Sequence, residues 1–202
     1  MKAWILAAIA IALSGAAARA ADPRYPDWPC TQAKVPEISL SAVWAGPALD
    51  DVQNKWKDDA KVSALVAKLS ARKTPLDEAE KSVKEFLAAS ASDKSANAKL
   101  LFAGLFDTLN AQRSQVMSGL ERVSRKQREA ADKIREETLA LQALQGATPR
   151  DEAKVEALSN ELIWKTRIFE DRHKVVRFVC EVPTTIDQRL FALGRVIQQE
   201  ME

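Results

Sequence analysis

A long stretch of heptad-spaced apolar residues, from Lys94 to Gln145, constrains the fold of this chain more than any other feature. The stretch contains no proline, and its two glycines, Gly104 and Gly119, are isolated. Steps of four and three residues from Phe102 reach mostly apolar side chains: Phe106, Leu109, Arg113, Val116, Leu120, Val123, Gln127, Ala130, Ile134, Glu137, Leu141 and Leu144. This alternation is typical of a left-handed coiled coil and predicts one helix roughly 75 Å long.

The next segment predicts a second long helix that folds back along the first. Gly146 ends the first helix, Thr148 caps the next one, and Pro149 occupies its first position. The same spacing then continues to Pro183, which ends the helix, through Val155, Leu158, Leu162, Lys165, Phe169, Arg172, Val176 and Val179. Because so short a connection makes the helices antiparallel, we expect a coiled-coil hairpin over residues 94–182, with residue 180 near residue 114.

Three shorter helical patterns complete an all-α fold of about five helices within residues 48–202. They run from Leu49 to Arg72, from a Thr74 cap with Pro75 at the first position, and from a Thr184 or Thr185 cap. The base of the long helix, residues 95–115, extends beyond its partner. We therefore expect the three shorter helices to cover it, as a compact base from which the hairpin protrudes. Arg113 is predicted to pair with Glu181 there, because a buried charge needs a partner.

Residues 21–47 differ from the rest of the chain because prolines and aromatic residues alternate there. Such proline density excludes a helix and predicts an extended strap, whose aromatic side chains pack into grooves of the helical body. Residues 38–44 fit either one helical turn or a short extended piece. The strap is interpreted as a clamp held by Cys30, and the alternative is an arm that docks a partner.

The two cysteines, Cys30 and Cys180, predict one structural disulfide between the strap and the junction of hairpin and base. A free or redox-active thiol is the alternative. Neither cysteine lies in a CxxC motif or near a histidine in sequence, which favours the structural interpretation.

The N-terminus has the three parts of a secretory signal peptide. Lys2 precedes an apolar run, and Ala18-Arg19-Ala20 provides a cleavage site, so the signal is residues 1–20 and the mature chain begins at Ala21. A retained membrane anchor is the alternative, but the apolar run is shorter than the ~20 residues that span a bilayer. We expect a periplasmic or secreted protein with no transmembrane segment in the mature chain.

The mature chain is predicted to be electrically neutral, because Lys2 and Arg19 belong to the signal and the whole chain has 30 basic and 28 acidic residues. Nucleic-acid binding usually needs a large positive excess, so no nucleic-acid partner is expected. Basic residues nevertheless gather where the two hairpin helices are adjacent. This basic belt comprises Arg122, Arg125, Lys126, Arg128, Lys165, Arg167, Arg172, Lys174 and Arg177. It is either a contact for an anionic partner or an ordinary solvated flank of the hairpin.

The sequence predicts no catalytic site, metal site or cofactor. Its single histidine, His173, forms Glu-x-x-His with Glu170, which is half of a di-iron motif whose second histidine is missing. One histidine on a long helix also cannot complete a serine triad, and the six glycines form no phosphate-binding loop.

One N-terminal string resembles that of a group of exported proteobacterial helical proteins. It consists of Trp28-Pro29-Cys30-Thr31-Gln32, Lys34-Val35-Pro36-Glu37 and Trp44-Ala45-Gly46-Pro47. The resemblance spans residues 28–47 and implies no activity. The remaining chain is similar in shape to periplasmic helical-hairpin adaptors and chaperones, an analogy of fold alone.

These patterns favour a non-enzymatic exported scaffold or adaptor whose hairpin contacts an envelope protein or an anionic envelope component. The alternative is a periplasmic helical bundle that responds to a small ligand or a metal, similar to a stress sensor. A homo-oligomer is compatible with both, because heptads serve intermolecular as well as intramolecular coils.

Overall fold

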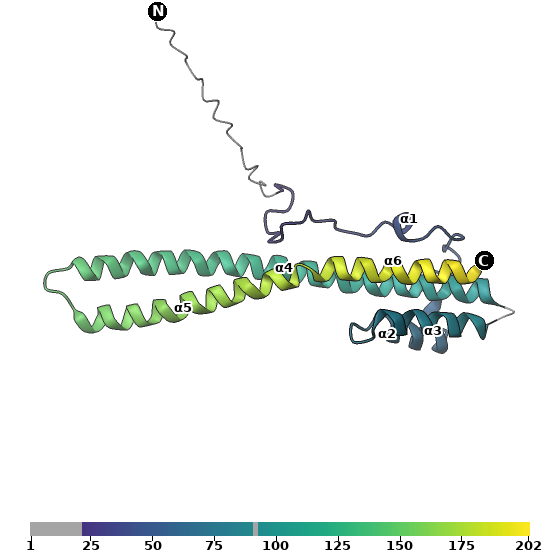
Figure 1. The fold of residues 1–202 in the computed structure, drawn as a ribbon. Coiled ribbons are helices and arrows are strands. Elements are labelled where there is room, and N and C mark those ends of the chain that lie inside the picture. Colours follow the sequence, from purple (N-terminus) through teal and green to yellow (C-terminus); the bar gives the residue numbers. More distant parts are fainter. Residues whose placement is uncertain (1–21, 91–92) are drawn as a thin grey trace, which may run out of the picture.

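The computed structural model describes residues 22–90 and 93–202 and has an elongated, all-α architecture (Figure 1). The predicted signal peptide lies outside the described residues. Within them the elements are α1 (Leu40–Val43), the 3-10 helix η1 (Lys55–Lys57), α2 (Ala60–Ser70), α3 (Leu76–Ala88), α4 (Lys94–Gly146), α5 (Glu152–Val179) and α6 (Val182–Met201). These residues contain no strand, and none of their helices is long and apolar enough to cross a membrane.

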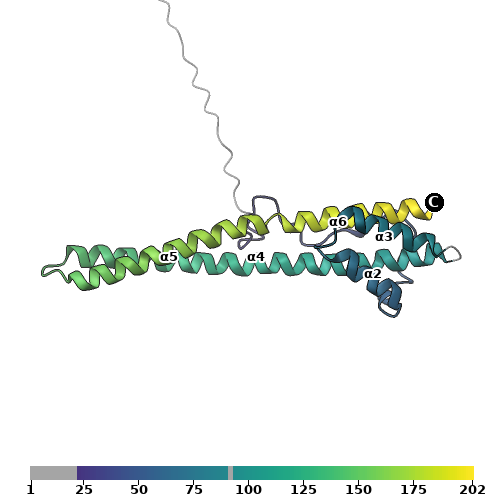
Figure 2. The ribbon, with the colours of Figure 1, turned by 60° about the horizontal axis from the view of Figure 1, so that its bottom comes forward.

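The 53-residue helix α4 is the axis of the molecule and is about 80 Å long. Helix α5 runs antiparallel to its C-terminal part, and α6 then continues in the same direction along its N-terminal part (Figure 2). The predicted antiparallel pairing of the two long helices is therefore present. Along α4, the less exposed positions recur at steps of four and three residues.

The pairing register of α4 and α5 is shifted by a few residues from the prediction of residue 180 near residue 114, because Cys180 packs on Leu120. The side-chain amide of Gln127 donates a hydrogen bond to the carbonyl oxygen of Phe169 at 3.1 Å, whereas the predicted register would place residue 167 there. Two predicted inward positions are wrong. Val123 is 40% exposed and Arg172 is exposed as well. Both residues lie at the edge of the helix pair, where Val123 borders a surface groove.

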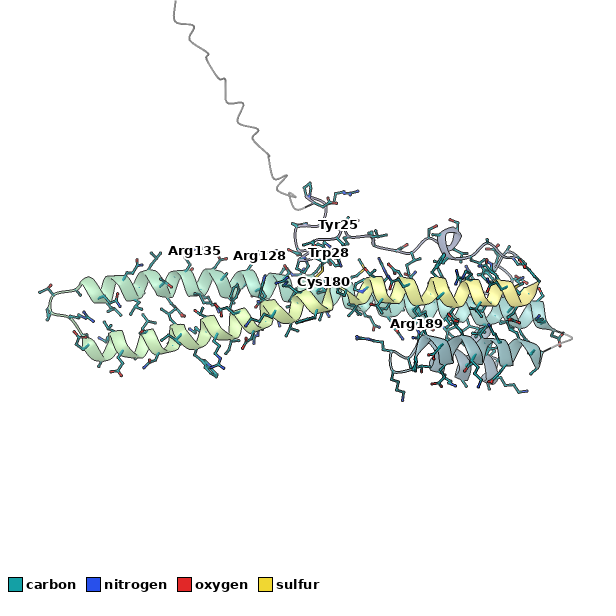
Figure 3. The ribbon with its side chains drawn as sticks, viewed as in Figure 1. Tyr25, Trp28, Arg128, Arg135, Cys180 and Arg189 are labelled. Atoms are coloured by element: carbon teal, nitrogen blue, oxygen red, sulfur yellow. A yellow bond between two sulfur atoms is a disulfide. The ribbon has the colours of Figure 1, made fainter. Side chains whose placement is uncertain are left out.

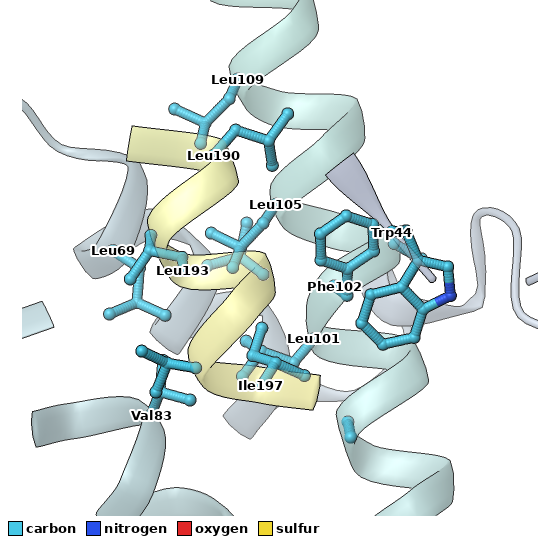
Figure 4. Packing of buried hydrophobic residues seen from close by; sticks show 14 of the residues in the cluster. Trp44, Leu69, Val83, Leu101, Phe102, Leu105, Leu109, Leu190, Leu193 and Ile197 are labelled. Carbon is cyan, nitrogen blue, oxygen red and sulfur yellow. The ribbon is translucent and has the colours of Figure 1, made fainter. Parts of the chain in front are cut away.

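The hydrophobic core lies at the end of the molecule away from the turn between α4 and α5. It is formed between α2, α3, α6 and the N-terminal part of α4 (Figure 4). Its largest fully buried side chains are Val62, Val66, Leu69, Val83, Leu87, Leu101, Phe102, Leu105, Leu109, Leu190, Leu193 and Ile197. The last part of the strap closes this core, because Trp44 stacks on Phe102 with ring centroids 4.2 Å apart. This is the predicted base, and α2, α3 and α6 cover the part of α4 that extends beyond α5.

Several predicted helix boundaries in the base are wrong. The helix expected from Leu49 begins only at Ala60, where Asp59 accepts hydrogen bonds from the backbone amides of Lys61 and Val62. The preceding residues form turns and η1, and Asn54 adopts a left-handed conformation there with φ of 65°. An apolar repeat of α-helical spacing, which includes Trp56, thus continues through turns and a 3-10 helix.

The predicted threonine caps of α3 and α5 are also wrong. The hydroxyl of Thr74 makes a different hydrogen bond, and an aspartate rather than a threonine caps α5. The hydroxyl of Thr74 donates to the carbonyl oxygen of Lys68 at 2.9 Å, and Pro75 itself takes the cap position of α3. Helix α5 is capped by Asp151, which accepts from the amide of Lys154, rather than by Thr148.

The boundary between α5 and α6 differs from the prediction as well. Pro183 lies in the first turn of α6, and Thr184 lies inside that helix. Proline is tolerated in the first turn because its missing N–H would have no intrahelical acceptor there. The break therefore falls at Cys180 and Glu181, and α6 follows α5 with only a short turn between them.

Arg113 is buried, as a predicted inward position should be, but its partner is not Glu181. Its guanidinium contacts the carboxylate of Asp187 at 2.7 Å and donates to the carbonyl oxygen of Val35 at 2.6 Å and to that of Pro36 at 3.2 Å. Burial raises the pKa of Asp187, and the nearby Arg113 opposes that rise. One buried cation thus ties α4 to both α6 and the strap.

Candidate interaction site on the helical hairpin

The strap crosses the hairpin where α5 ends, and a disulfide fixes it there (Figure 3). Cys30 and Cys180 are bonded, with their Cα atoms 5.6 Å apart, so the predicted disulfide is present. Gln32 donates from its side-chain amide to the carbonyl oxygen of Cys180, and the indole of Trp28 donates to the carbonyl oxygen of Gln32 at 2.7 Å. The disulfide and Trp28 pack on Leu120 and neighbouring valines, forming a small second core.

Two arginines of the predicted basic belt hold the N-terminal end of the strap. Asp27 receives a hydrogen bond from Arg125 at 2.7 Å and another from Arg128, which also donates to the carbonyl oxygen of Pro26 at 3.2 Å. Arg125 first and Arg128 second lower the pKa of Asp27 below its ordinary value. These two arginines therefore have an intramolecular role, and the clamp interpretation of the strap accounts for them.

A second ion pair fixes the strap beyond the disulfide. The ammonium of Lys34 lies 2.6 Å from the carboxylate of Glu121, and both side chains are largely shielded from solvent. The same ammonium lies 4.5 Å from the ring centroid of Tyr25, in cation–π geometry. The strap thus covers the α4 face that carries Glu121, Arg125 and Arg128.

On α5, some belt residues pair with acids and others do not. Lys165 lies between Glu137 and Glu161, which together raise its pKa, Glu137 more strongly. Lys174 pairs with Asp171 at 3.2 Å. Within the described part of the chain, the remaining α5 members, Arg167, Arg172 and Arg177, form no ion pair.

An apolar groove lies between α4 and α5, and three unpaired belt cations border it. The groove has a volume of about 700 Å³. Its lining is Val116, Gly119, Leu120, Val123, Gln127, Val175, Val176 and Val179, with Arg122, Lys126 and Arg172 as its cations. Among the described residues these three cations have no acidic partner. We call this set the cationic groove.

The cationic groove and the strap contact different flanks of α4. Each residue of a helix is rotated by about 100° from the one before, so Lys126 beside the groove and Arg128 beside the strap project nearly opposite each other, with Arg122 and Arg125 between them. Asp27 of the strap pairs with Arg125 and Arg128, whereas no acid of the described residues pairs with Arg122 or Lys126. The predicted belt is therefore divided into a part used within the molecule and a part that faces solvent.

Other site types are not indicated by the described residues. No group of three or more His, Cys, Asp and Glu side chains there is arranged to hold a metal ion. His173 is exposed on α5, as is Glu170 three residues before it.

Sequence reasoning missed Asp27 as the partner of Arg125 and Arg128. A signal for it was present, because Cys30 next to Cys180 places the preceding strap residues beside α4 near residue 120. The sequence pattern also gave no signal for the groove, since the apolar repeat places Val123 between the two helices and does not include Val175. Exposure at the edge of a helix pair depends on helix rotation, which the apolar repeat defines only approximately.

Comparisons with family models, with curated proteins and with solved structures each gave no match to this chain.

Proposed function

We propose that this protein is a non-enzymatic, exported helical scaffold or adaptor whose hairpin binds an anionic envelope component through the cationic groove. One observation carries the proposal. Three cations without acidic partners, Arg122, Lys126 and Arg172, border an apolar surface on a chain whose formal net charge is only +2. Unpaired cations beside apolar surface favour an occupant that carries both negative charge and apolar area.

The division of the belt supports the solvent-facing cations as the functional ones. Arg125 and Arg128 share the single negative charge of Asp27, so their attraction to an external anion is reduced. Arg122 and Lys126 lie on the same helix within the same few turns and have no such acid. An anionic partner would therefore contact the groove side of the hairpin rather than the strap side.

The test is co-sedimentation of the mature, oxidised chain with vesicles of phosphatidylglycerol and phosphatidylcholine, and with purified peptidoglycan. We expect binding to one anionic material, weakened by salt because exposed charges are screened. The double variant Arg122→Glu/Lys126→Glu should lose at least tenfold in affinity. Its matched control is Lys133→Glu/Arg135→Glu, which makes the same charge change on two exposed residues of α4 outside the groove.

Equal binding by the double variant and the wild type at low salt would contradict the proposal. Arg125 and Arg128 are unsuitable for this test, because reversing them repels Asp27 and loosens the strap. A loss of binding would then have two explanations. The groove cations avoid this difficulty, since circular dichroism can confirm that helicity is retained.

The second candidate is a helical bundle that responds to a small ligand, and the volume of the groove favours it. About 700 Å³ lies within the ~300–1,000 Å³ range of small-molecule sites, which are mostly apolar with a few polar groups. Thermal melting with a soluble anionic amphiphile and with divalent metals distinguishes the candidates, because a ligand that binds only the folded state raises the midpoint. A midpoint shift with amphiphile, without binding to vesicles or peptidoglycan, would favour this candidate.

A further inference from the structure

Helix α5 carries a second apolar face, on the side that is not packed against α4, although one of its residues, Val175, also lines the cationic groove. Its inward face includes Val155, Leu162 and Val176, which are nearly buried against α4. The residues on the opposite side recur at steps of four and three: Ala153, Ala157, Asn160, Trp164, Ile168, Asp171, Val175 and Phe178. We call this set the outer face of α5.

The outer face exposes large hydrophobic side chains to solvent. Trp164 is 61% exposed, Val175 59% and Phe178 77%. Figures 1 and 2 show α4 beside α5 and no other described helix against it. Such a row of exposed apolar residues is costly in water and is typical of a protein interaction site.

We propose that the outer face of α5 binds the same face of a second copy of this chain, with the two helices antiparallel. The outer face is complementary to itself when Trp164 of one copy lies against Ile168 of the other. A two-fold axis then makes each contact occur twice, as in isologous dimers.

At that register the sizes and polarities of the facing residues agree. Ala157 lies opposite Val175 of the second copy, and Ala153 opposite its Phe178, so that small residues face large ones. The two polar residues of the face also meet, because Asn160 lies opposite Asp171 of the second copy. The amide of an asparagine donates to a carboxylate, so neither group is left without a partner in the interface.

The charges beside the outer face agree with the same register. Glu161 and Arg172 both flank the face on the same side, and in an antiparallel pair residues on one flank meet each other. Glu161 then lies beside Arg172 of the second copy, and this ion pair also occurs twice. Arg172 has no acidic partner within the described residues of its own chain. An apolar row with this charge complementarity favours a second copy over an unrelated partner.

The test is sedimentation of the mature, oxidised chain over a dilution series. We expect dimer mass at high concentration and monomer mass after dilution. Trp164→Asp should remain monomeric at every concentration, while its circular dichroism and melting temperature stay close to wild type because Trp164 is exposed. Phe191→Asp, on α6 and 52% exposed, is the matched control and should still dimerise.

A charge exchange tests the register. Glu161→Arg and Arg172→Glu should each weaken association at least tenfold, because each brings like charges together. The double variant Glu161→Arg/Arg172→Glu restores opposite charges and should regain most of the affinity. A wild type that is monomeric throughout, a Phe191→Asp variant that dissociates like Trp164→Asp, or a double variant as weak as the singles would overturn the proposal.

This inference is tested separately from the proposed function, although Val175 belongs to both surfaces and both proposals use Arg172. Trp164 does not line the cationic groove, and Arg122 and Lys126 do not lie on the outer face of α5. If Trp164→Asp removes vesicle binding while the wild type stays monomeric, the outer face contacts a membrane surface and self-association is excluded.

Discussion

Gly104 and Gly119 lie on the same helix, but only the first is required by packing. A Cβ atom at Gly104 would lie 2.7 Å from a methyl group of Val66 and 2.9 Å from the ring of Trp56. At Gly119 the nearest such atom is the end of the Arg122 side chain, 3.8 Å away, which is an ordinary contact. Gly104→Ala should therefore lower the free energy of unfolding by about 1–3 kcal/mol, as in other overpacked cores.

Gly119→Ala is the matched substitution and should act in the opposite direction. Alanine is favoured over glycine in a helix interior by up to about 1 kcal/mol, and no steric penalty offsets this at Gly119. Urea unfolding of both variants measures the difference. Equal destabilisation by the two substitutions would show that the close approach at Gly104 has no energetic consequence.

Removal of Arg113 should affect two segments that are far from it in sequence, the strap and α6. In Arg113→Leu, the carbonyl oxygens of Val35 and Pro36 lose their donor and Asp187 loses its cation. We expect a loss of about 1–3 kcal/mol in stability. Because Arg113 lowers the pKa of Asp187, that pKa should also rise further, which NMR titration measures. An unchanged pKa of Asp187 would contradict the ion pair.

Among the elements, the strap has a pH dependence that follows from Asp27. In the folded protein the pKa of Asp27 lies below the ordinary value of 3.8. Asp27 therefore contributes its full stabilisation of the docked strap when the pH is above that ordinary value. The contribution is lost as the pH falls through the lowered pKa. The protection of residues 22–29 against hydrogen exchange, expressed relative to the intrinsic rate at each pH, should fall in the wild type on acidification. In Asp27→Asn this protection should already be low near pH 7, with no further step.

The distal hairpin is held together by a narrow row of mostly partly buried residues along each helix. Ile134 is a partly buried seam position, so Ile134→Asp places a charge between α4 and α5. We expect faster hydrogen exchange on both sides of the turn, with the base unchanged. Leu139→Asp is the control on the same helix, since Leu139 is 60% exposed and should tolerate the charge. Cooperative unfolding of the base with the hairpin would contradict this separation.

The elements that the sequence predicts well are those whose apolar repeat is long. The extent of α4 and its antiparallel pairing with α5 follow from many positions, so single errors such as Val123 do not matter. The boundaries were wrong where one residue has alternative roles. Thr74 bonds to an earlier carbonyl instead of capping α3, and Pro183 begins a helix instead of ending one. Such choices depend on tertiary packing, which a single sequence does not specify.

The candidate site could likewise be predicted only in part from the sequence. Basic residues could be located on α4 and α5, but their partners could not. Asp27 is far from Arg125 in sequence, and the disulfide together with the neighbouring strap contacts brings it there. Which cations remain available to a partner therefore depends on the path of the strap, and composition alone does not reveal it.

For the whole molecule, burial is concentrated at one end. Side chains with no exposure, such as Leu105 and Leu190, lie in the base. The inward residues of α5, including Leu162 and Val176, keep 8% and 9% of their surface exposed. Regions with fewer buried contacts open locally at lower free energy, so the hairpin should be less stable than the base. A hairpin of lower stability than the base is compatible with the proposed interaction surface.

The disulfide joins these two parts, and its removal should separate them energetically. It closes a loop over a sequence separation of 150 residues, for which chain entropy predicts a contribution of at most about 5 kcal/mol. In Cys30→Ser, and in the reduced wild type, the melting temperature should fall and residues 22–35 should exchange first. The core around Phe102 should keep its protection, since Trp44 still stacks there. If that core loses protection together with the strap, the disulfide supports the whole fold rather than the strap alone.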